Sequence, residues 1–496
     1  MQSYSEKVKI VRKANFPSRQ LVATADLLPG DVILEEQPLL VAPHWECEQM
    51  KCSQCMLDSF VMCKKCEFFP LCIDCTNHNS YDCDFFCNTG AGAKISKNLL
   101  VENYAIYGVL KLLLLMENPT SGEQCAALSA TPGAAVVDSD AWQEREVHIV
   151  NPLLQSGIAQ AFKQVKVTHE LLHTLCWRID ANAFEVAASD GNTLKGVYVC
   201  CAQLPHNCVP NTVVTIDEEF HLKLYASVRI RAGDIIYNSY TNPLMGTSQR
   251  QHELRLTKGI ECTCARCSDP LELGTHMSSL KCQQCATGFV VCTGPIRDGK
   301  RSGEWKCTSC GATMDTAMVK ELLVDVGEAL LETNSELLAY ESLLDKYGGR
   351  FHQNHFVLVE IKQNIAAILR AILMNPMCVP GQDLLERKLQ LCEELMPLVR
   401  TVLPGISKLY GIALYEYLLS YMELAELMYE DKEAGNAALI FQEKLENARD
   451  IAAKAKEMLR FEPSNSPEGH LVSRIAMEQK RIEENLGQLN SKRNGV

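Results

Sequence analysis

The cysteines of this chain are its most evident metal-binding residues, because they gather in clusters with short, regular gaps. The first cluster holds eight thiols between positions 52 and 87, mostly as C-x2-C pairs. Zinc prefers four thiolate or imidazole ligands in a tetrahedron, and a two-residue gap lets one tight turn present two sulfur atoms to one ion. Eight ligands therefore indicate two zinc ions, which would supply most of the folding free energy of so small a block. The candidate ligands are Cys52, Cys55, Cys63, Cys66, Cys72, Cys75, Cys83 and Cys87.

Two further clusters follow later in the chain. The stretch CTCARC supplies Cys262, Cys264 and Cys267 and lacks a fourth ligand. Cys208, within LPHNCVPNT at 204–212, is the natural candidate, although alone it could equally be a buried neutral thiol. The third cluster, C-x2-C-x21-C-x2-C, has the spacing of a structural zinc ribbon formed by Cys282, Cys285, Cys307 and Cys310.

Sixteen cysteines would thus hold about four zinc ions. The spacing of the other eight cysteines does not suggest a ligand role; these are Cys47, Cys125, Cys176, Cys200, Cys201, Cys292, Cys378 and Cys392.

Composition limits the class of protein. A chain of 496 residues is expected to form two to four domains. Its net charge of −13 argues against strong direct binding to DNA. The first residues, MQSYSEKVKIVRK, have no apolar core, and the aliphatic run VLKLLLLM at 109–116 is far shorter than the ~20 residues that span a bilayer. We therefore expect a soluble intracellular protein without a membrane partner, in which clustered cysteines bind metal rather than form disulfides.

The elements that must position these clusters alternate between strand and helix. Residues 8–41 and 197–240 are rich in β-branched and aliphatic residues and predict strands. Residues 95–180, and the region from Met314 to about Lys480, have helical periodicity. The long second region fits stacked antiparallel helices, although it has no clean repeat period. The expected fold class is α+β.

Several stretches, in this order along the chain, resemble the SET and MYND domain family of protein-lysine methyltransferases. They are LVATADLLPGDVILEEQPLL at 21–40, RIDANAFEV at 178–186, PHNCVPN at 205–211, AGDIIYNSY at 232–240, CTCARC at 262–267 and FHQNHF at 351–356. The stretch DPLELGT, followed by the ribbon, is most similar to the insect members.

The resemblance implies a β-rich, pseudo-knotted SET domain that is split by a MYND zinc finger. A cysteine-rich post-SET segment with a zinc ribbon and a helical, TPR-like carboxyl-terminal domain would follow. The implied boundaries are 1–47 for the first part of the SET domain, 48–88 for the MYND finger, 89–180 for a helical insert, 181–259 for the SET core, 260–312 for the post-SET cluster and ribbon, and 313–496 for the helical domain.

The resemblance also implies how the ligands are shared. In a MYND finger the first and third pairs bind one zinc ion and the second and fourth pairs bind the other. Cys83 stands where the family has histidine, with His78 nearby as an alternative ligand, and the third pair is one residue tighter than usual. In the post-SET segment, Cys208 would join the three cysteines of CTCARC on one ion.

For the chemistry, the resemblance implies S-adenosylmethionine as methyl donor and Tyr240 as the catalytic residue. A neutral lysine amine attacks the sulfonium methyl group in line, so the enzyme mainly has to orient both reactants and exclude water. Phe184 and Lys258 would line the substrate channel. The implied cofactor contacts are Arg19, Asn182, His206, Tyr240 and Ile260.

The chain departs from the family at four places in this site. The amino-terminal GRG is SRQ at 18–20, Pro205 replaces a cofactor-binding asparagine, and Ile260 replaces an adenine-stacking phenylalanine. A lost amide hydrogen bond costs ~1 kcal/mol, and lost base stacking costs ~1–3 kcal/mol. Lys258 replaces a channel tyrosine and would either repel an incoming lysine or fill the channel.

Two functions from different classes fit this pattern. The first is an S-adenosylmethionine-dependent methyltransferase that acts on a histone tail or another lysine-bearing protein, with a role in transcriptional regulation. The second is a weakly active or inactive scaffold or corepressor, whose MYND finger binds proline-containing peptides and whose helical domain shapes a groove. An automethylating enzyme, or one that acts on another residue, is a third alternative. All of these fit the nucleus, the cytoplasm or both.

Overall fold

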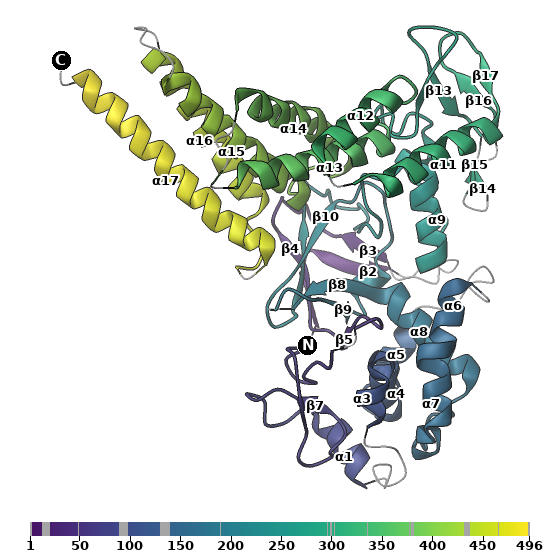
Figure 1. Ribbon diagram of the computed structural model, residues 1–496. Coiled ribbons are helices and arrows are strands. Elements are labelled where there is room, and N and C mark those ends of the chain that lie inside the picture. The colour runs from purple at the N-terminus through teal and green to yellow at the C-terminus, as the bar shows by residue number, and fades with distance from the viewer. Residues whose placement is uncertain are drawn as a thin grey trace.

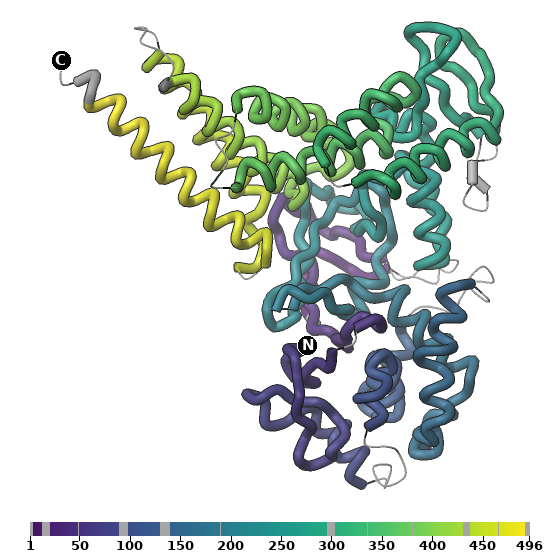
Figure 2. The backbone as a smooth tube through the Cα atoms, in the orientation of Figure 1, coloured from purple at the N-terminus to yellow at the C-terminus, as the bar shows by residue number. Residues whose placement is uncertain are grey.

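The protein combines β-sheets with many helices, as expected for an α+β fold (Figures 1 and 2). The computed structural model describes residues 2–11, 20–47, 49–88, 98–128, 139–188, 190–294, 296–297, 300–301, 303–334, 336–375, 377, 381–430, 437–464 and 466–494. Cys378 and Arg19, which were named from the sequence, lie outside these residues.

Two small antiparallel sheets form the centre of the molecule. The first has the strand order β1 (Gln2–Tyr4), β4 (Val32–Glu36), β11 (Leu222–Ala226) and β10 (Thr212–Ile216). The second has the order β5 (Leu40–Pro43), β9 (Thr193–Val197) and β8 (Ala183–Ala187). Burial alternates along β11, where Leu222, Leu224 and Ala226 are buried, because successive side chains of a strand point to opposite faces. Most strands expected in 8–41 are present, since β2 (Val8–Val11) also pairs with β3 (Gln20–Ala23).

The segment that leads to Tyr240 is held beside the 205–212 turn by a crossing of the chain. His206 and Asn238 form an isolated parallel bridge. The Asn211 side chain donates to the Ile235 carbonyl (2.9 Å) and accepts from the Tyr237 amide (2.8 Å). The expected strand over 232–240 is therefore mostly irregular, because the Asn211 side chain takes two of the bonds that a neighbouring strand would otherwise make.

The cysteine-rich finger and the helical insert share one hydrophobic core with the sheets. The finger contains β6 (Val61–Met62), β7 (Pro70–Leu71) and α1 (Ser80–Asn88). The insert contains α3 (Leu99–Glu102), η1 (Tyr104–Ile106), α4 (Tyr107–Glu117), α5 (Gly122–Ala127), α6 (Asp140–Arg145), the π-helical turn η2 (Glu146–Val150), α7 (Asn151–Gln155), η3 (Ile158–Ala161) and α8 (His169–Asn182). The aliphatic run at 109–116 is the buried helix α4, and no described helix is long and apolar enough to cross a membrane.

After the central sheets the chain forms α9 (Thr247–Lys258), α10 (Ala265–Ser268) and a ribbon sheet of order β12 (Leu280–Lys281), β13 (Phe289–Cys292), β16 (Trp305–Cys307) and β17 (Thr313–Met314). A short hairpin, β14 (Ile296–Arg297) and β15 (Lys300–Arg301), extends from it. In the described part of the chain seven long helices follow: α11 (Thr316–Glu332), α12 (Leu337–Gly348), α13 (Phe356–Leu373), α14 (Gln382–Val402), α15 (Lys408–Glu430), α16 (Ala437–Met458) and α17 (Pro467–Asn494). Figure 2 shows α14–α17 running side by side away from the central sheets.

The carboxyl-terminal helices dock on the first sheet through a few close contacts. The Phe461 ring stacks on Tyr225 of β11 with centroids 3.9 Å apart. The Ile406 amide donates to the Ser227 carbonyl at 2.9 Å. Gly405 has φ +80°, and a Cβ atom there would lie 1.9 Å from the Ser227 oxygen. The docking therefore requires a residue without a side chain at position 405.

We expect Gly405→Ala to destabilise the protein by about 2–4 kcal/mol, because it combines left-handed backbone strain with a steric clash. Gly274→Ala is the matched control, since Gly274 has φ +75° but a Cβ atom there would meet no other atom within 4 Å. Urea unfolding of both variants at constant zinc measures the difference. An equal loss of stability in the two variants would contradict the docking role of Gly405.

Candidate active site and metal centres

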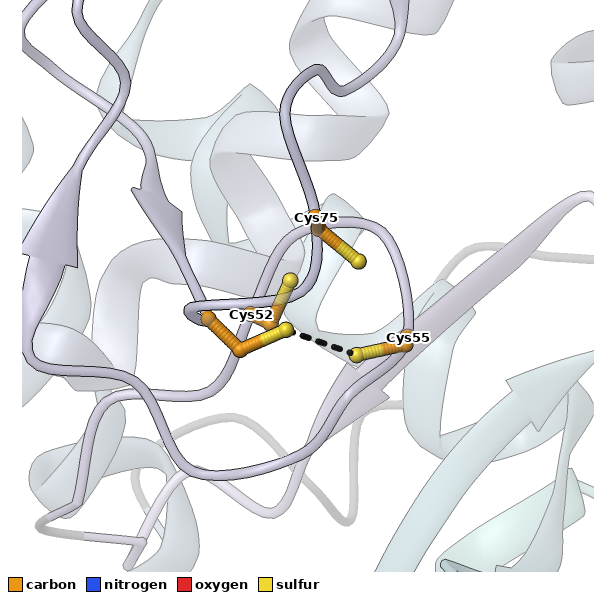
Figure 3. Close-up of side chains that lie close together, drawn as sticks. Cys52, Cys55 and Cys75 are labelled. Carbon is orange, nitrogen blue, oxygen red and sulfur yellow. Dashed lines mark hydrogen bonds between the residues drawn. The ribbon is translucent and has the colours of Figure 1, made fainter.

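Four cysteines of the finger form the first candidate zinc centre. Cys52, Cys55, Cys72 and Cys75 have all four sulfur atoms within 4.8 Å of one another, and Figure 3 shows the side chains of Cys52, Cys55 and Cys75 turned toward a common point. The sulfur atoms of Cys55 and Cys72 are 3.6 Å apart. Two thiolates on one tetrahedral zinc at ~2.3 Å stand about 3.8 Å apart. The first and third pairs therefore come together with the spacing of zinc ligands.

The second centre of the finger differs from the expected set at one ligand. The structure gathers Cys63, Cys66, His78 and Cys83, whereas the prediction from sequence had Cys87 in place of His78. His78 Nε2 lies 3.3 Å from Cys66 Sγ, and burial lowers the pKa of His78 to about 4, so the ring is neutral as a zinc ligand must be. Cys87 is exposed, and its thiol faces the Lys65 carbonyl at 3.5 Å. The alternative ligand noted in the sequence, His78, thus takes the fourth place.

Cys208 lies with the three cysteines of CTCARC at 262–267. Its sulfur is 3.4 Å from Cys267 Sγ and 3.9 Å from Cys262 Sγ, and Cys264 completes the group. These thiols come from the 205–212 turn and from the segment after α9, so a shared metal ion would join two segments that are far apart in sequence. The spacing again fits tetrahedral zinc.

Two buried arginines, which no sequence motif indicated, lie beside this cluster. Arg250 donates to Cys208 Sγ at 3.3 Å and to Cys267 Sγ at 3.7 Å. Its guanidinium also pairs with Glu272 at 2.9 Å, and Arg266 contacts the same carboxylate at 3.3 Å. Although burial by itself would raise the pKa of Glu272, the two arginines hold it below its usual value. N–H donors to the thiolates offset the negative charge of a buried four-thiolate zinc centre.

The ribbon carries the fourth centre, formed by Cys282, Cys285, Cys307 and Cys310. The Cys282–Cys310 and Cys285–Cys307 sulfur pairs are 3.7 and 3.6 Å apart. A Cβ atom at Gly288 would lie only 2.2 Å from Cys307 Sγ. The chain therefore keeps room for the sulfur cluster by placing glycine beside it.

A fifth group, Glu146 with His169 and His173, has the right atom types for a metal but the wrong spacing. Glu146 Oε2 lies 2.7 Å from His169 Nε2 and 2.6 Å from His173 Nε2. Nitrogen and oxygen ligands of one zinc ion at ~2.1 Å would stand about 3.4 Å apart. The observed separations are those of hydrogen bonds, so these residues join η2 to α8.

Tyr240 directs its hydroxyl toward main-chain carbonyls. Its Oη lies 2.8 Å from the Leu204 oxygen, 3.2 Å from that of Cys201 and 3.4 Å from that of Ala202. Desolvation raises the pKa of Tyr240 well above its usual value, so the hydroxyl remains neutral. The carbonyls belong to η4 (Cys201–Gln203) and the residue after it.

Glu36, a buried carboxylate of β4, orients this group of carbonyls. It accepts hydrogen bonds from the amides of Cys200 (2.8 Å) and Cys201 (3.0 Å). These bonds satisfy two amides at the start of η4, which would otherwise be buried without partners. Burial nevertheless raises the pKa of Glu36. No local sequence pattern reveals this role of Glu36, because the residue lies far from η4 in the chain.

His206 connects the Tyr240 site to the cysteine cluster. The Tyr240 amide donates to His206 Nδ1 at 3.1 Å, and His206 Nε2 lies 3.3 Å from Cys208 Sγ. Since Nδ1 accepts a hydrogen bond, the ring proton of the neutral imidazole is on Nε2 and points to the sulfur. Burial lowers the pKa of His206 to about 4, which keeps the ring neutral.

The two predicted channel residues both lie beside Tyr240. The Phe184 ring meets the Tyr240 ring edge to face, with centroids 6.4 Å apart. Lys258 Nζ lies 5.0 Å from the centroid of the Tyr240 ring and donates to the Ala181 carbonyl at 2.6 Å. Burial lowers the pKa of Lys258 to about 8.

Two of the predicted cofactor residues, Asn182 and Ile260, also lie near Tyr240 and Lys258. Asn182 is buried and donates to the Arg178 carbonyl at 2.8 Å, and Ile260 packs with Tyr240 against the cysteine cluster. Arg178 Nε and Glu253 Oε2 are buried polar atoms without a partner in the described part of the chain. Such atoms on α8 and α9 fit a polar ligand such as S-adenosylmethionine, while the Lys258 amine disfavours a cation.

No protein-family model matches the chain, but several known proteins are similar to it in sequence. The chain is 26% identical over 310 residues to SET domain-containing protein SmydA-8, isoform B, of Drosophila melanogaster. This match covers 59% of this chain and 64% of that protein. It is 20% identical over 449 residues to histone-lysine N-methyltransferase ASHR1 of Arabidopsis thaliana, which covers 85% of this chain and 88% of that protein. A match to histone-lysine N-methyltransferase SET5 of Candida glabrata is 40% identical over 83 residues and covers 16% of each chain. The matched region thus spans less than two thirds of the SmydA-8 isoforms.

Substitution of His78 tests the ligand set of the finger. We expect His78→Ala to lower the bound zinc from about four ions to about three, because three thiolates hold zinc less tightly than four ligands do. Cys87→Ser is the matched control and should leave the zinc content unchanged. Metal analysis of the purified variants measures both. If Cys87→Ser loses zinc and His78→Ala does not, Cys87 is the fourth ligand, as expected from the sequence.

The lowered pKa of Lys258 predicts a pH dependence of stability. Between the folded value of about 8 and the usual 10.5, the folded chain binds fewer protons at this residue than the unfolded chain does. The contribution of Lys258 to the free energy of unfolding therefore rises with pH across this window. Urea unfolding of the wild type and of Lys258→Met at pH 7.5 and 9.5 should show the wild type gaining relative to the variant. A constant difference between them would contradict the desolvation of this amine.

Proposed function

Because the chain is an insect-type protein of the SET and MYND kind, we propose that it is an S-adenosylmethionine-dependent protein-lysine methyltransferase. The observation that carries this proposal is the setting of Tyr240, whose hydroxyl faces three main-chain carbonyls beside the Phe184 ring. The names of two relatives, both histone-lysine N-methyltransferases, support a histone tail or another lysine-bearing protein as substrate.

In this proposal the chain itself supplies orientation and desolvation rather than acid–base chemistry. The carbonyl oxygens of Cys201, Ala202 and Leu204 attract the positive charge that develops on an amine as it is methylated. The Tyr240 hydroxyl orients the amine, and Phe184 contacts its aliphatic stem. Glu36 and His206 act as positioning residues, since they hold the η4 carbonyls and the Tyr240 main chain.

Asn182 and the turn around His206 would hold the cofactor, which supplies an electrophilic methyl group when bound. Tyr240 lies next to this turn, so its hydroxyl is close to both reactants. Four zinc ions would act structurally at the clusters described above, because each cluster already provides four protein ligands.

A second function, a scaffold or corepressor of low activity, is favoured by the surface of the finger and by Pro205. Phe60 and Ile73 of the finger are 88% and 92% exposed, as suits the binding of a proline-containing peptide. Pro205 has no amide hydrogen to offer a cofactor, and its carbonyl accepts from the Asn238 amide at 3.1 Å. Either function is compatible with a role in transcription and with residence in the nucleus, the cytoplasm or both.

Cofactor binding and the substitution Tyr240→Phe test the enzyme proposal. We expect S-adenosylhomocysteine to bind the wild type and the variant with similar affinity in calorimetry. Methyl transfer should fall roughly 10²–10³-fold in the variant, the usual effect of losing one well-placed hydrogen-bonding group in an active site.

Tyr237→Phe is the control, because the Tyr237 contacts that hold the turn are made by its main chain. Absence of S-adenosylhomocysteine binding at millimolar concentration would exclude the enzyme and leave the scaffold.

A further inference from the structure

The side chain of Lys258 turns into the Tyr240 site instead of into solvent. Lys258 is the last residue of α9, and Gly259 ends the helix with φ +65°. The amine reaches across to α8, where it donates to the carbonyl of Ala181, the residue before Asn182. It also lies over the face of the Tyr240 ring. The amine thus stands between Tyr240 and the residues that we propose to hold the cofactor.

The surroundings of this amine differ from those of lysines that serve the fold. The three buried lysines among the described residues each pair with a carboxylate: Lys51 with Asp58 and Asp190, Lys362 with Glu394, and Lys388 with Glu416. Lys258 has no ion pair with any described residue and contacts a carbonyl oxygen and an aromatic face instead. An ion pair would fix the amine as an ammonium ion, whereas a carbonyl and a ring also tolerate the neutral form.

These contacts are of the kind that a methyltransferase must offer to a substrate lysine. The acceptor amine needs an oxygen acceptor to orient it, an aromatic wall along its stem and removal from bulk water so that a neutral fraction exists. Burial already lowers the pKa of Lys258 to about 8, which supports such a fraction at neutral pH. A substrate lysine from another protein would have to displace this side chain.

We propose that Lys258 is a methylation site of this protein, presented in cis to its own Tyr240 site. The proposal rests on the methyltransferase function proposed above and names its acceptor. The lone pair of the neutral Lys258 nitrogen forms the new N–C bond to the methyl carbon of S-adenosylmethionine. The S–C bond breaks, its electron pair remains on sulfur as the neutral thioether, and the new methylammonium releases a proton to water if it is to react again.

Isotope labelling of the full-length protein tests the acceptor. The purified chain is incubated with S-adenosylmethionine that carries a deuterated methyl group, and cleavage after glutamate releases the peptide Leu254–Glu261 for mass spectrometry. We expect the label on Lys258 in the wild type and its loss in Tyr240→Phe. The buried Lys362, which donates to the Gln353 carbonyl and pairs with Glu394, is the internal control and should stay unlabelled.

Mixing two chains separates transfer in cis from transfer between molecules. The initial rate per chain should not change over a tenfold range of protein concentration. When wild type is mixed with a Tyr240→Phe chain of distinguishable mass, only the wild type should carry the label. Label on the Tyr240→Phe chain would overturn presentation in cis.

A binding measurement tests the position of the amine without methyl transfer. S-adenosylmethionine is a sulfonium cation, whereas S-adenosylhomocysteine is a neutral thioether of almost the same shape. Lys258→Met keeps a linear side chain but removes the charge, so it should raise the affinity for the cation relative to the thioether several-fold. An unchanged ratio would mean that the Lys258 amine does not face the methyl group, which would overturn the proposal.

The outcomes distinguish the two proposals. If S-adenosylhomocysteine binds and another protein is methylated while Lys258 stays unlabelled, the inference about Lys258 fails and the methyltransferase function stands. If neither cofactor form binds, the methyltransferase function itself fails.

Discussion

The joining of Cys208 to Cys262, Cys264 and Cys267 is the constraint on which the Tyr240 site depends. These sulfur atoms hold the 205–212 turn against the segment after α9. The 205–212 turn also fixes Tyr240, because the His206 ring accepts a hydrogen bond from the Tyr240 amide on one side and faces the Cys208 sulfur on the other. A ring with two such partners has one tautomer and one orientation. The cysteine cluster therefore acts on the Tyr240 site through main-chain position.

The charges around this constraint are arranged in two different ways. Near the cluster, Arg250 and Arg266 share Glu272, so the buried thiolates have cationic neighbours and each charge has a partner. Near Tyr240 the only cation in contact, Lys258, has a carbonyl and an aromatic ring but no carboxylate among the described residues. Full pairing stabilises a fixed structure, while an unpaired and desolvated amine keeps access to its neutral, nucleophilic form. The difference separates the residues that hold this region from the residue that we propose reacts in it.

Much of the fold and of the metal centres could be predicted from the chain alone. A C-x2-C pair aims two sulfurs by local geometry, so the gathering of Cys52, Cys55, Cys72 and Cys75 needed little beyond spacing and the family pattern. The long helices after residue 314 follow from periodicity over many residues. The prediction of a strand over 232–240 was less successful, because Asn211 side-chain bonds replace ladder bonds there. Local pattern cannot reveal which distant side chain will satisfy a main-chain group.

The sequence by itself determined which residue types stand at the Tyr240 site and which family they resemble, since both follow from identity and order along the chain. Only the tertiary structure decided which of them meet. It selected His78 over Cys87, because the fourth ligand depends on which of two nearby side chains the folded turn and α1 bring to the sulfurs of Cys63 and Cys66. It also decided between the two roles that the sequence left to Lys258, which were to repel an incoming lysine or to fill the channel. The end of α9 directs the amine onto Tyr240 and the Ala181 carbonyl, and that direction arises from the packing of α9 against α8, which no local pattern encodes.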